Sequence, residues 1–228
     1  MRAISLAILA SIAAFGASQQ TAKLPAATED GLTVWVYALE GNAPAQMPTL
    51  VEGQTPNYYA IHRELNLQDG VNSQEGDIKT NFVGKAFGYF IAPKDATYTF
   101  RLVADDFADL SIGGIKVTQA GVDGSSSESS IKLKSGVYPI NVNFFQKGGK
   151  FYVRLEQKQE DGKWGLVPSS QLKSEAGQTF VVAPGQKKWF LGKDTNRPGD
   201  GRPLTGVHPS FKLETFRPDP FHPAVGGM

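Results

Sequence analysis

The sequence predicts an all-β protein, an antiparallel β-sandwich or flattened barrel followed by an extension rich in Pro and Gly. From Gly31 to Leu172, short runs with alternating apolar residues are separated by clusters of Gly, Asn, Asp, Ser and Pro. The best candidate for a helix, residues 58–67, is brief. The chain has 228 residues, of which 40% are hydrophobic and 20% charged, so it is long and apolar enough for one folded domain with its own core.

The first strands are expected on both sides of a long loop. In residues 32–39, LTVWVYAL, both alternating sets are apolar, so we expect this strand to be covered on both faces. A loop rich in Gly, Ala and Pro follows over residues 41–57. The strand predicted for residues 81–93, NFVGKAFGYFIAP, contains Gly84 and Gly88, which indicate a bulge or the close approach of another segment.

The strand predicted next, ATYTFRLVADD, alternates strictly over residues 96–106. One set of its side chains is expected to face the core: Tyr98, Phe100, Leu102 and Ala104. Further along, the Ser-rich residues 121–130, GVDGSSSESS, contain little to bury and are expected to form an exposed loop.

Three tight connections are expected between the remaining strands. Gly113-Gly114 supplies the pair of positive φ angles that a short hairpin turn requires. Lys147–Lys150 contains a second Gly-Gly pair and joins two strands within residues 136–157. Asp161-Gly162 is the turn of a third hairpin.

The amino terminus indicates an export signal over residues 1–18. Arg2 is followed by an apolar stretch, residues 3–14, and by small residues that a signal peptidase accepts. The apolar stretch is shorter than the ~20 residues needed to cross a bilayer, so we expect a cleaved signal and no membrane partner afterwards. The protein is therefore expected to be exported to the periplasm, the cell surface or the outside of the cell.

Charge and composition exclude several function classes. The formal net charge of +1 falls to zero when Arg2 is removed, which argues against a nucleic acid or an anionic membrane as partner. The chain contains no Cys, so the sequence offers no disulfide, thiolate nucleophile or thiol metal site. We expect three parts: the signal, a β domain over residues 28–182, and a linker or the start of a further domain over residues 183–228.

Several ordered motifs resemble the protective-antigen-type domain, or PA14 domain, across residues 28–172. The motifs are GLTVWVY, FVGKAFGYFIAPKDATYTFRLVADDFADLSIGGIKV, SIKLKSGVYPINVNFF and GLVPSSQL. The chain departs from the family at Ala96, where a Gly is usual, and this implies a different turn. The resemblance implies a β-sandwich that is a non-catalytic binding module, with carbohydrate or a cell-surface glycan as its partner.

The carboxyl-terminal region carries a second resemblance. RPGDGRPLTGVHPSFKLETFRPDPFHPAVGGM is similar to the segment that joins such a domain to a sugar-dehydrogenase-like β-propeller using pyrroloquinoline quinone. This implies an alternative function, a structural accessory domain attached to a catalytic carboxyl-terminal domain.

Asp105 and Asp106, in ADDFADLSIGG, follow directly on an apolar strand and are the candidate site residues. One interpretation is that they cap a turn by accepting backbone N–H bonds. The resemblance implies the other, in which a cis peptide lets both carboxylates bind a calcium ion that takes sugar hydroxyls. In the family's adhesins, a long loop completes that site, whereas this chain has the short QKGGK, which argues against adhesin-style sugar binding. Both interpretations stay open, and no other cofactor is predicted.

Other residue types give weaker signals. The three histidines, His62, His208 and His222, lack the spacing of a zinc site. There is no nucleophile motif, and adjacent aspartates do not suit the spacing of a glycosidase pair, so no catalytic residue is predicted. Trp35, Trp164 and Tyr58-Tyr59 have rings that can stack on sugars, but aromatic residues of β-sandwiches more often pack in the core or at an edge.

Overall fold

The computed structural model describes residues 19–73, 76–121, 125–178, 182 and 185–191. The expected export signal and most of the expected linker lie outside these ranges. Within them, no helix is long and apolar enough to cross a membrane.

Almost all regular structure in the described residues is β-strand, as the sequence predicts. The elements in chain order are β1 (Thr28–Asp30), β2 (Leu32–Ala38), β3 (Tyr58–His62), β4 (Asn66–Gln68), β5 (Val71–Ser73), β6 (Gly76–Ile78), β7 (Phe82–Ala92), β8 (Ala96–Asp105), β9 (Phe107–Ile112), β10 (Ile115–Ala120), β11 (Ser126–Leu133), β12 (Gly136–Gln146), β13 (Tyr152–Lys158), β14 (Trp164–Leu166), the 3-10 turn η1 (Ser169–Gln171) and β15 (Leu172–Glu175).

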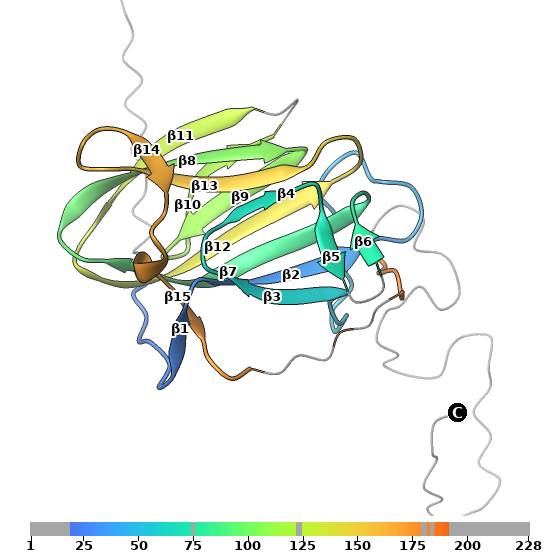
Figure 1. The fold of residues 1–228 in the computed structure, drawn as a ribbon, viewed down its shortest axis with the longest axis horizontal. Helices are drawn as coiled ribbons and strands as arrows, with labels where there is room; N and C mark the ends of the chain where they lie inside the picture. The colour runs from blue at the N-terminus through green and yellow to red at the C-terminus, as the bar shows by residue number, and fades with distance from the viewer. Residues whose placement is uncertain (1–18, 74–75, 122–124, 179–181, 183–184, 192–228) are drawn as a thin grey trace, which may run out of the picture.

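Two antiparallel sheets form the sandwich (Figure 1). The larger sheet has eight strands in the order β1-β15-β7-β12-β9-β10, with β2 beside β7 and β3 beside β2. The smaller sheet has five, in the order β11-β8-β13-β14, with β4 also paired to β13. The predicted fold class, an antiparallel β-sandwich, is confirmed.

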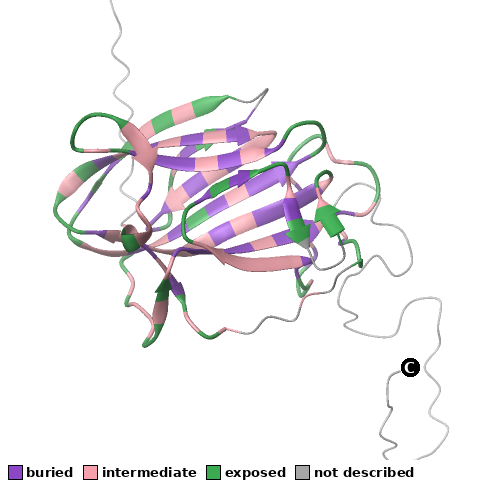
Figure 2. Cartoon of the chain, in the orientation of Figure 1, coloured by how far each residue is buried: buried purple, intermediate pink, exposed green. Residues whose placement is uncertain are grey.

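The main core fills the space between the sheets. Buried residues alternate with less buried ones along the strands, as Figure 2 shows, and β8 follows the alternation expected from its sequence. Phe100 of β8 is fully buried and meets Phe90 of β7 edge to face, with ring centroids 5.4 Å apart. Because these strands belong to opposite sheets, the pair ties the two layers together.

β2 is covered on both faces, which confirms the prediction for this strand. Val34 and Val36 belong to the main core, whereas Tyr37 belongs to a second apolar cluster with Leu39, Val83 and Phe145. The second cluster lies on the outer face of the larger sheet, where Met47, Leu50 and Phe190 pack against it.

The expected close approaches at Gly84 and Gly88 are also confirmed. A Cβ at Gly84 would lie 2.3 Å from ring atoms of Phe144. A Cβ at Gly88 would lie 2.4 Å from the backbone oxygen of Lys173. Any side chain at either position would therefore push neighbouring atoms apart.

Two of the three expected turns join paired strands. Gly113 and Gly114, with φ of 60° and 77°, connect β9 to β10, and Gly162, with φ of 79°, lies in the connection between β13 and β14. Lys147–Lys150 does not form a hairpin, because β12 pairs with β7 and β9 whereas β13 pairs with β8. This connection instead crosses from one sheet to the other.

One local expectation was wrong, and the weak helix candidate is strand. Within residues 58–67, Tyr58–His62 pairs with β2 and Asn66 begins β4, in agreement with the expected absence of a long helix. The Ser-rich residues 126–130 are not loop but the start of β11, which pairs with β8 along its whole length. Its second half carries the buried Ile131 and Leu133, whereas the Ser-rich half is held by its backbone pairing with β8, so the Ser composition misled the prediction.

Part of the expected linker lies against the sandwich. Lys188 forms a parallel bridge with Leu39, and Phe190 an antiparallel bridge with Leu50. The described residues 185–191 therefore continue the structure of the β domain.

Candidate functional site at the end of β8

Asp105 and Asp106 lie where the chain leaves the smaller sheet for the larger one. Asp105 is the last residue of β8, Asp106 lies between the strands, and β9 begins at Phe107. The peptide bond between the two aspartates is cis, as the resemblance implies. Asp105 lies opposite Tyr152 of β13 in the sheet register.

The Asp106 carboxylate caps the neighbouring turn. Its Oδ2 accepts a hydrogen bond from the backbone N–H of Lys147 at 2.7 Å and a longer one from Gly148 at 3.5 Å. These residues begin the short QKGGK connection between the sheets. The capping interpretation therefore fits the contacts of Asp106. The backbone N–H that it caps belongs to a residue 41 positions further along the chain.

A third segment packs against the backbone of Asp106. Gly121 follows β10 with φ of 99°, and a Cβ there would lie 2.3 Å from the Asp106 backbone oxygen. The backbone N–H of Gly121 donates to Ser125 Oγ at 3.0 Å. Sequence reasoning missed Gly121, although a Gly directly after a strand is a signal for such a close contact.

The side-chain oxygens at the end of β8 supply only part of the ligand set that a hard cation requires. Calcium takes six to eight oxygen ligands, and carboxylates are its preferred protein donors. Asp109, the third acid of the motif, instead accepts a hydrogen bond from Asn143 Nδ2 at 2.9 Å on the larger sheet. Across the described ranges, no group of three or more His, Asp or Glu side chains could hold a metal ion. Asp105 and Asp106 fit calcium by donor type, and most further ligands would be backbone oxygens, water or a bound hydroxyl.

A pocket of about 430 Å³ with both polar and apolar lining lies near Asp105, and sequence reasoning did not find it. Three segments line it: β4 with the residue after it, β8, and the start of β13 with the turn before it. The lining residues are Asn66, Gln68, Asp69, Val103, Lys150, Phe151, Tyr152 and Arg154. Tyr152 is opposite Asp105 in the sheet, and Val103 lies two residues before Asp105 on the same outward face. Asp105 is therefore at the edge of this pocket.

A charged network holds one wall of this pocket. Arg154 Nε lies 3.1 Å from Glu156 Oε1, and Arg101 Nε donates to Glu156 Oε2 at 2.5 Å. Glu156 is only 8% exposed, so the two guanidinium groups compensate a mostly buried carboxylate. This ion pair keeps Arg154 beside Glu156 without a hydrogen bond at Nε, and the N–H groups of Arg154 are donors suited to hydroxyl or carboxylate oxygens.

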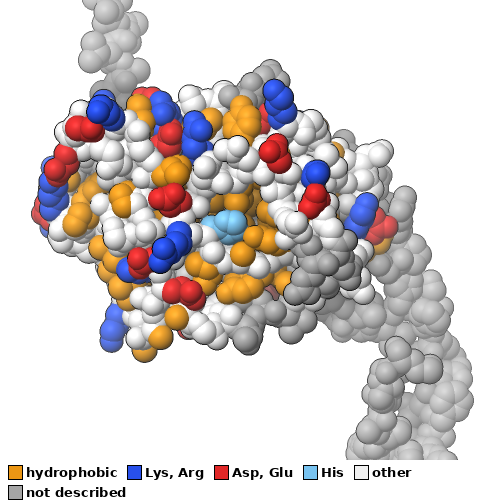
Figure 3. Space-filling view, in the orientation of Figure 1, with side chains coloured by type: hydrophobic (Ala, Val, Ile, Leu, Met, Phe, Trp, Pro, Cys, Tyr) orange, Lys and Arg blue, Asp and Glu red, His pale blue; other side chains and the backbone are white. Residues whose placement is uncertain are grey.

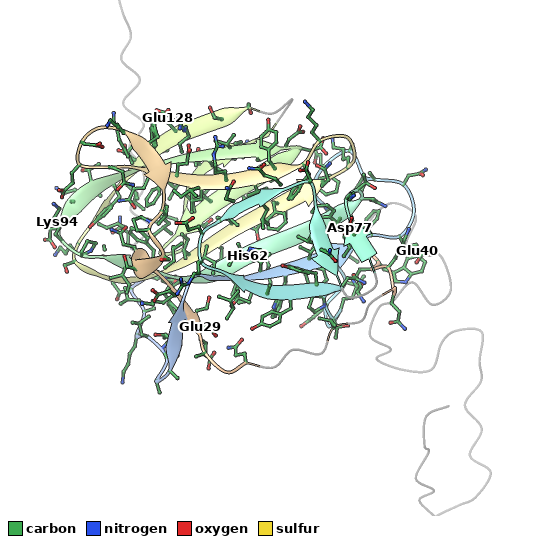
Figure 4. The ribbon with its side chains drawn as sticks, in the orientation of Figure 1. Glu29, Glu40, His62, Asp77, Lys94 and Glu128 are labelled. Atoms are coloured by element: carbon green, nitrogen blue, oxygen red, sulfur yellow. The ribbon has the colours of Figure 1, made fainter. Side chains whose placement is uncertain are left out.

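His62, the histidine within the described ranges, lies apart from the carboxylate pair and from the pocket. His62 Nε2 lies 2.8 Å from Tyr58 Oη, and burial lowers the pKa of His62. In Figure 3 the histidine on this face, in pale blue, borders hydrophobic side chains on one side, and Figure 4 shows His62 well separated from Glu128 and Glu40. His208 and His222 lie outside the described residues.

The aromatic candidates pack against other side chains. The Trp164 ring lies under Arg101, whose guanidinium carbon is 4.5 Å from the ring centroid. The Trp35 ring meets Phe87 edge to face at 4.9 Å. Trp35 also lines a separate pocket on the larger sheet.

The comparisons with known proteins point to one family. The sequence profile of the PA14 domain matches residues 30–178. Among curated proteins, no sequence matches this chain.

Three similar solved structures illustrate the likeness, and at these identities they show the fold alone. The PA14 domain of the antifreeze protein MpAFP is 16% identical with a TM-score of 0.54, and the match covers 71% of this chain and 100% of that one. A PA14 sugar-binding domain from an RTX adhesin is 16% identical with a TM-score of 0.53, covering 64% and 98%. An anti-sigma factor domain-containing protein is 19% identical with a TM-score of 0.53, covering 68% of this chain but only 51% of its own length. This chain thus spans about half of that last protein.

Proposed function

Because this chain belongs to the PA14 domain family, we propose that it is an exported, non-catalytic carbohydrate-binding module with its site at the end of β8. The observation that carries the proposal is the pocket lined by Tyr152 and Arg154, close to Asp105 in the sheet. A PA14 domain described as sugar-binding, from an RTX adhesin, supports it. The apolar stretch within residues 1–18 supports export.

The lining of the pocket suits a sugar. Asn66 and Gln68 contribute amide groups that can donate to and accept from hydroxyls, and Arg154 contributes further donors. Tyr152 contributes an aromatic ring with a polar tip, which can contact both the C–H face and the hydroxyls of a sugar. The pocket volume of about 430 Å³ accommodates one or two sugar rings.

We also propose that calcium takes part in binding, through Asp105 and Asp106. A bound calcium ion would supply a positive charge and open coordination positions for sugar hydroxyls. Both hydrogen bonds to the Asp106 carboxylate fall on Oδ2, so Asp106 would hold the turn and the ion together. The competing proposal is that Asp106 acts as a cap alone.

A glycan array with the full chain, in calcium and in chelator, tests the sugar proposal. We expect glycan binding that Arg154→Ala and Asp105→Ala reduce. The matched control is Asp161→Ala, because Asp161 also caps a turn, through Lys163 N–H at 3.0 Å, but lies in the hairpin between β13 and β14. An array with no bound glycan in either condition would reject carbohydrate binding.

Calorimetry and thermal unfolding then separate calcium binding from capping. If Asp106 binds calcium, calcium raises the melting temperature of the wild type, and Asp106→Ala removes that increase. If Asp106 only caps the turn, Asp106→Ala lowers stability by about 1 kcal/mol equally in calcium and in chelator.

The alternative function, a structural accessory domain of a quinone-dependent sugar dehydrogenase, has one observation in its favour. Residues 186–191 are bonded to the sandwich, so any following segment would leave the domain from a fixed point. The coding sequence downstream of Met228 tests this alternative. An open frame that continues into a propeller supports it, and a stop codon directly after Met228 rejects it for this chain.

A further inference from the structure

A second pocket, of about 490 Å³, lies on the outer face of the larger sheet and shares no residue with the first. Its floor comes from β2, β7 and β12: Trp35, Tyr37, Val83, Gly84, Lys85 and Asn143. Its wall is the loop between β2 and β3, residues 47–54. The floor therefore combines aromatic rings with a cation and an amide.

Hydrogen bonds fix the wall of this second pocket. Gln54 Oε1 accepts from the backbone N–H of Trp189 at 2.7 Å, and Gln54 Nε2 donates to the Trp189 oxygen at 2.5 Å. Gln54 Nε2 also donates to the Val51 oxygen at 3.1 Å, within the loop itself. The antiparallel bridge between Leu50 and Phe190 extends this contact. A wall held in this way preorganises the pocket for a ligand.

Lys85 is the cation of this pocket and has no anionic partner among the described residues. Its Nζ lies 4.3 Å from the Trp35 ring centroid and 4.8 Å from that of Phe87. Burial lowers the pKa of Lys85. Glu52 lines the rim, but it is exposed and forms no ion pair with Lys85. A half-buried ammonium held only by ring faces favours an anion from solution.

Asn143 lies beside Lys85 and is itself fixed. The two residues are opposite each other on β12 and β7, and Asn143 Nδ2 donates to Asp109 Oδ1 at 2.9 Å. This bond gives the Asp109 carboxylate a partner other than Lys85 and orients the amide of Asn143. Lys85 therefore keeps its capacity for a further acceptor.

We propose that this pocket binds a small carboxylate that carries a ring with an apolar face. The carboxylate would pair with Lys85, and the ring would lie against Trp35 and the apolar side of the wall, at Leu50. Uronic acids and aromatic acids share this chemistry, and the test distinguishes them. The proposal does not rest on the sugar site at the end of β8.

The test is an NMR titration of the full chain with two acids and two neutral relatives. The acids are glucuronate and phenylacetate, and the neutral compounds are methyl glucoside and phenylacetamide. We expect saturable shifts of the Trp35 indole signal with at least one acid, and binding at least about tenfold weaker with its neutral relative. Shifts with glucuronate alone identify an acidic sugar, and shifts with phenylacetate alone identify an aromatic acid.

Variants of Lys85 test the role of the charge. We expect Lys85→Gln to weaken acid binding at least about tenfold and Lys85→Arg to retain most of it. Lys116→Gln is the matched control, because Lys116 lies on β10 of the same sheet and bonds only to Gln119. If Lys85→Gln does not fold, the comparison of the acids with their neutral relatives in the wild type still tests whether the pocket prefers an anion.

Three results would overturn the proposal. One is the absence of shifts with both acids at about 10 mM, which corresponds to binding weaker than about 3 kcal/mol. Another is equal binding of the acid and its neutral relative. The third is a folded Lys85→Gln variant that binds the acids as the wild type does. Shifts confined to Tyr152 and its neighbours would also count against it, because they would place the ligand at the β8 end.

Discussion

Asp106 shows how one side chain can serve both proposed roles of the β8 end. Its carboxylate bonds to the turn that begins at Lys147, and its backbone oxygen packs against Gly121. Three segments far apart in the sequence therefore meet at this residue. A ligand bound by Asp106 would contact all three, so binding and local stability are coupled here.

Gly84 gives a residue-scale prediction about packing. Gly84→Ala places a methyl group 2.3 Å from the Phe144 ring and 2.9 Å from the Trp35 backbone oxygen, so we expect a loss of about 1–3 kcal/mol in the free energy of unfolding. Gly148→Ala is the control, because a Cβ there has nothing within 4 Å. Urea denaturation of both variants measures the difference. Equal stability of the two would contradict the close packing of β7 against β12.

His62 gives a residue-scale prediction about pH. Burial holds the pKa of His62 below its ordinary value of 6.5, so the unfolded state takes up a proton first as the pH falls. The folded state therefore loses stability as the pH drops below about 6.5, and it does not regain this at lower pH. We expect the loss of stability between about pH 7.5 and pH 5.5 to be smaller in His62→Gln than in the wild type. Identical pH profiles from chemical denaturation would argue against a shifted His62.

At the scale of elements, the smaller sheet shows why composition misled the prediction for β11. Glu128 lies opposite Arg101 of β8 in the register, and their side chains form an ion pair of 3.9 Å. Thr99 and Ser130 hydrogen-bond across the same two strands at 2.8 Å. Polar cross-strand pairs thus replace apolar contacts on this outer face.

The contact between residues 47–54 and residues 186–191 gives an element-scale prediction. Gln54→Ala removes two hydrogen bonds that hold the loop to the carboxyl-terminal segment and a third within the loop, so we expect it to cost about 1–2 kcal/mol of unfolding free energy. Gln119→Ala is the control, since Gln119 is exposed on β10 and accepts only from Lys116. Chemical denaturation of both variants measures the costs. A neutral Gln54→Ala would show that the segment contributes nothing to stability.

For the whole molecule, the connections between sheets make the two layers one unit. The chain crosses between them at Asp106 and again at Lys147–Lys150, and aromatic pairs such as Phe90 with Phe100 bridge the core. Neither sheet can bury its apolar face alone. Loss of one layer therefore exposes the core of the other.

This arrangement predicts a single unfolding transition. Trp35 reports on the larger sheet and Trp164 on the smaller one, so single-Trp variants that keep either residue separate the two signals. We expect the two fluorescence transitions and the circular dichroism transition to coincide in urea. Midpoints that differ between the Trp35 and Trp164 signals would contradict a common core.

The predictive power of the sequence differs between parts of the candidate site. The position of Asp105 and Asp106 at a strand end was predictable, because strict alternation over β8 and the Gly-Gly hairpin after it are local patterns. The two pockets were not, since Asn66 and Arg154, or Leu50 and Lys85, lie far apart in the chain. Nothing in a local pattern places such residues together.

The sequence by itself determined where long strands such as β2, β7 and β8 lie, which faces of β2 and β8 are apolar, and where glycines allow tight turns. These properties depend on the alternation of side chains and on the φ angles of single residues. Only the tertiary structure decided that β12 and β13 lie in opposite sheets, that Ser126–Ser130 is a strand, and that residues 185–191 hold the loop of residues 47–54. Pairing partners depend on how whole faces fit together, and that fit is a property of the assembled core.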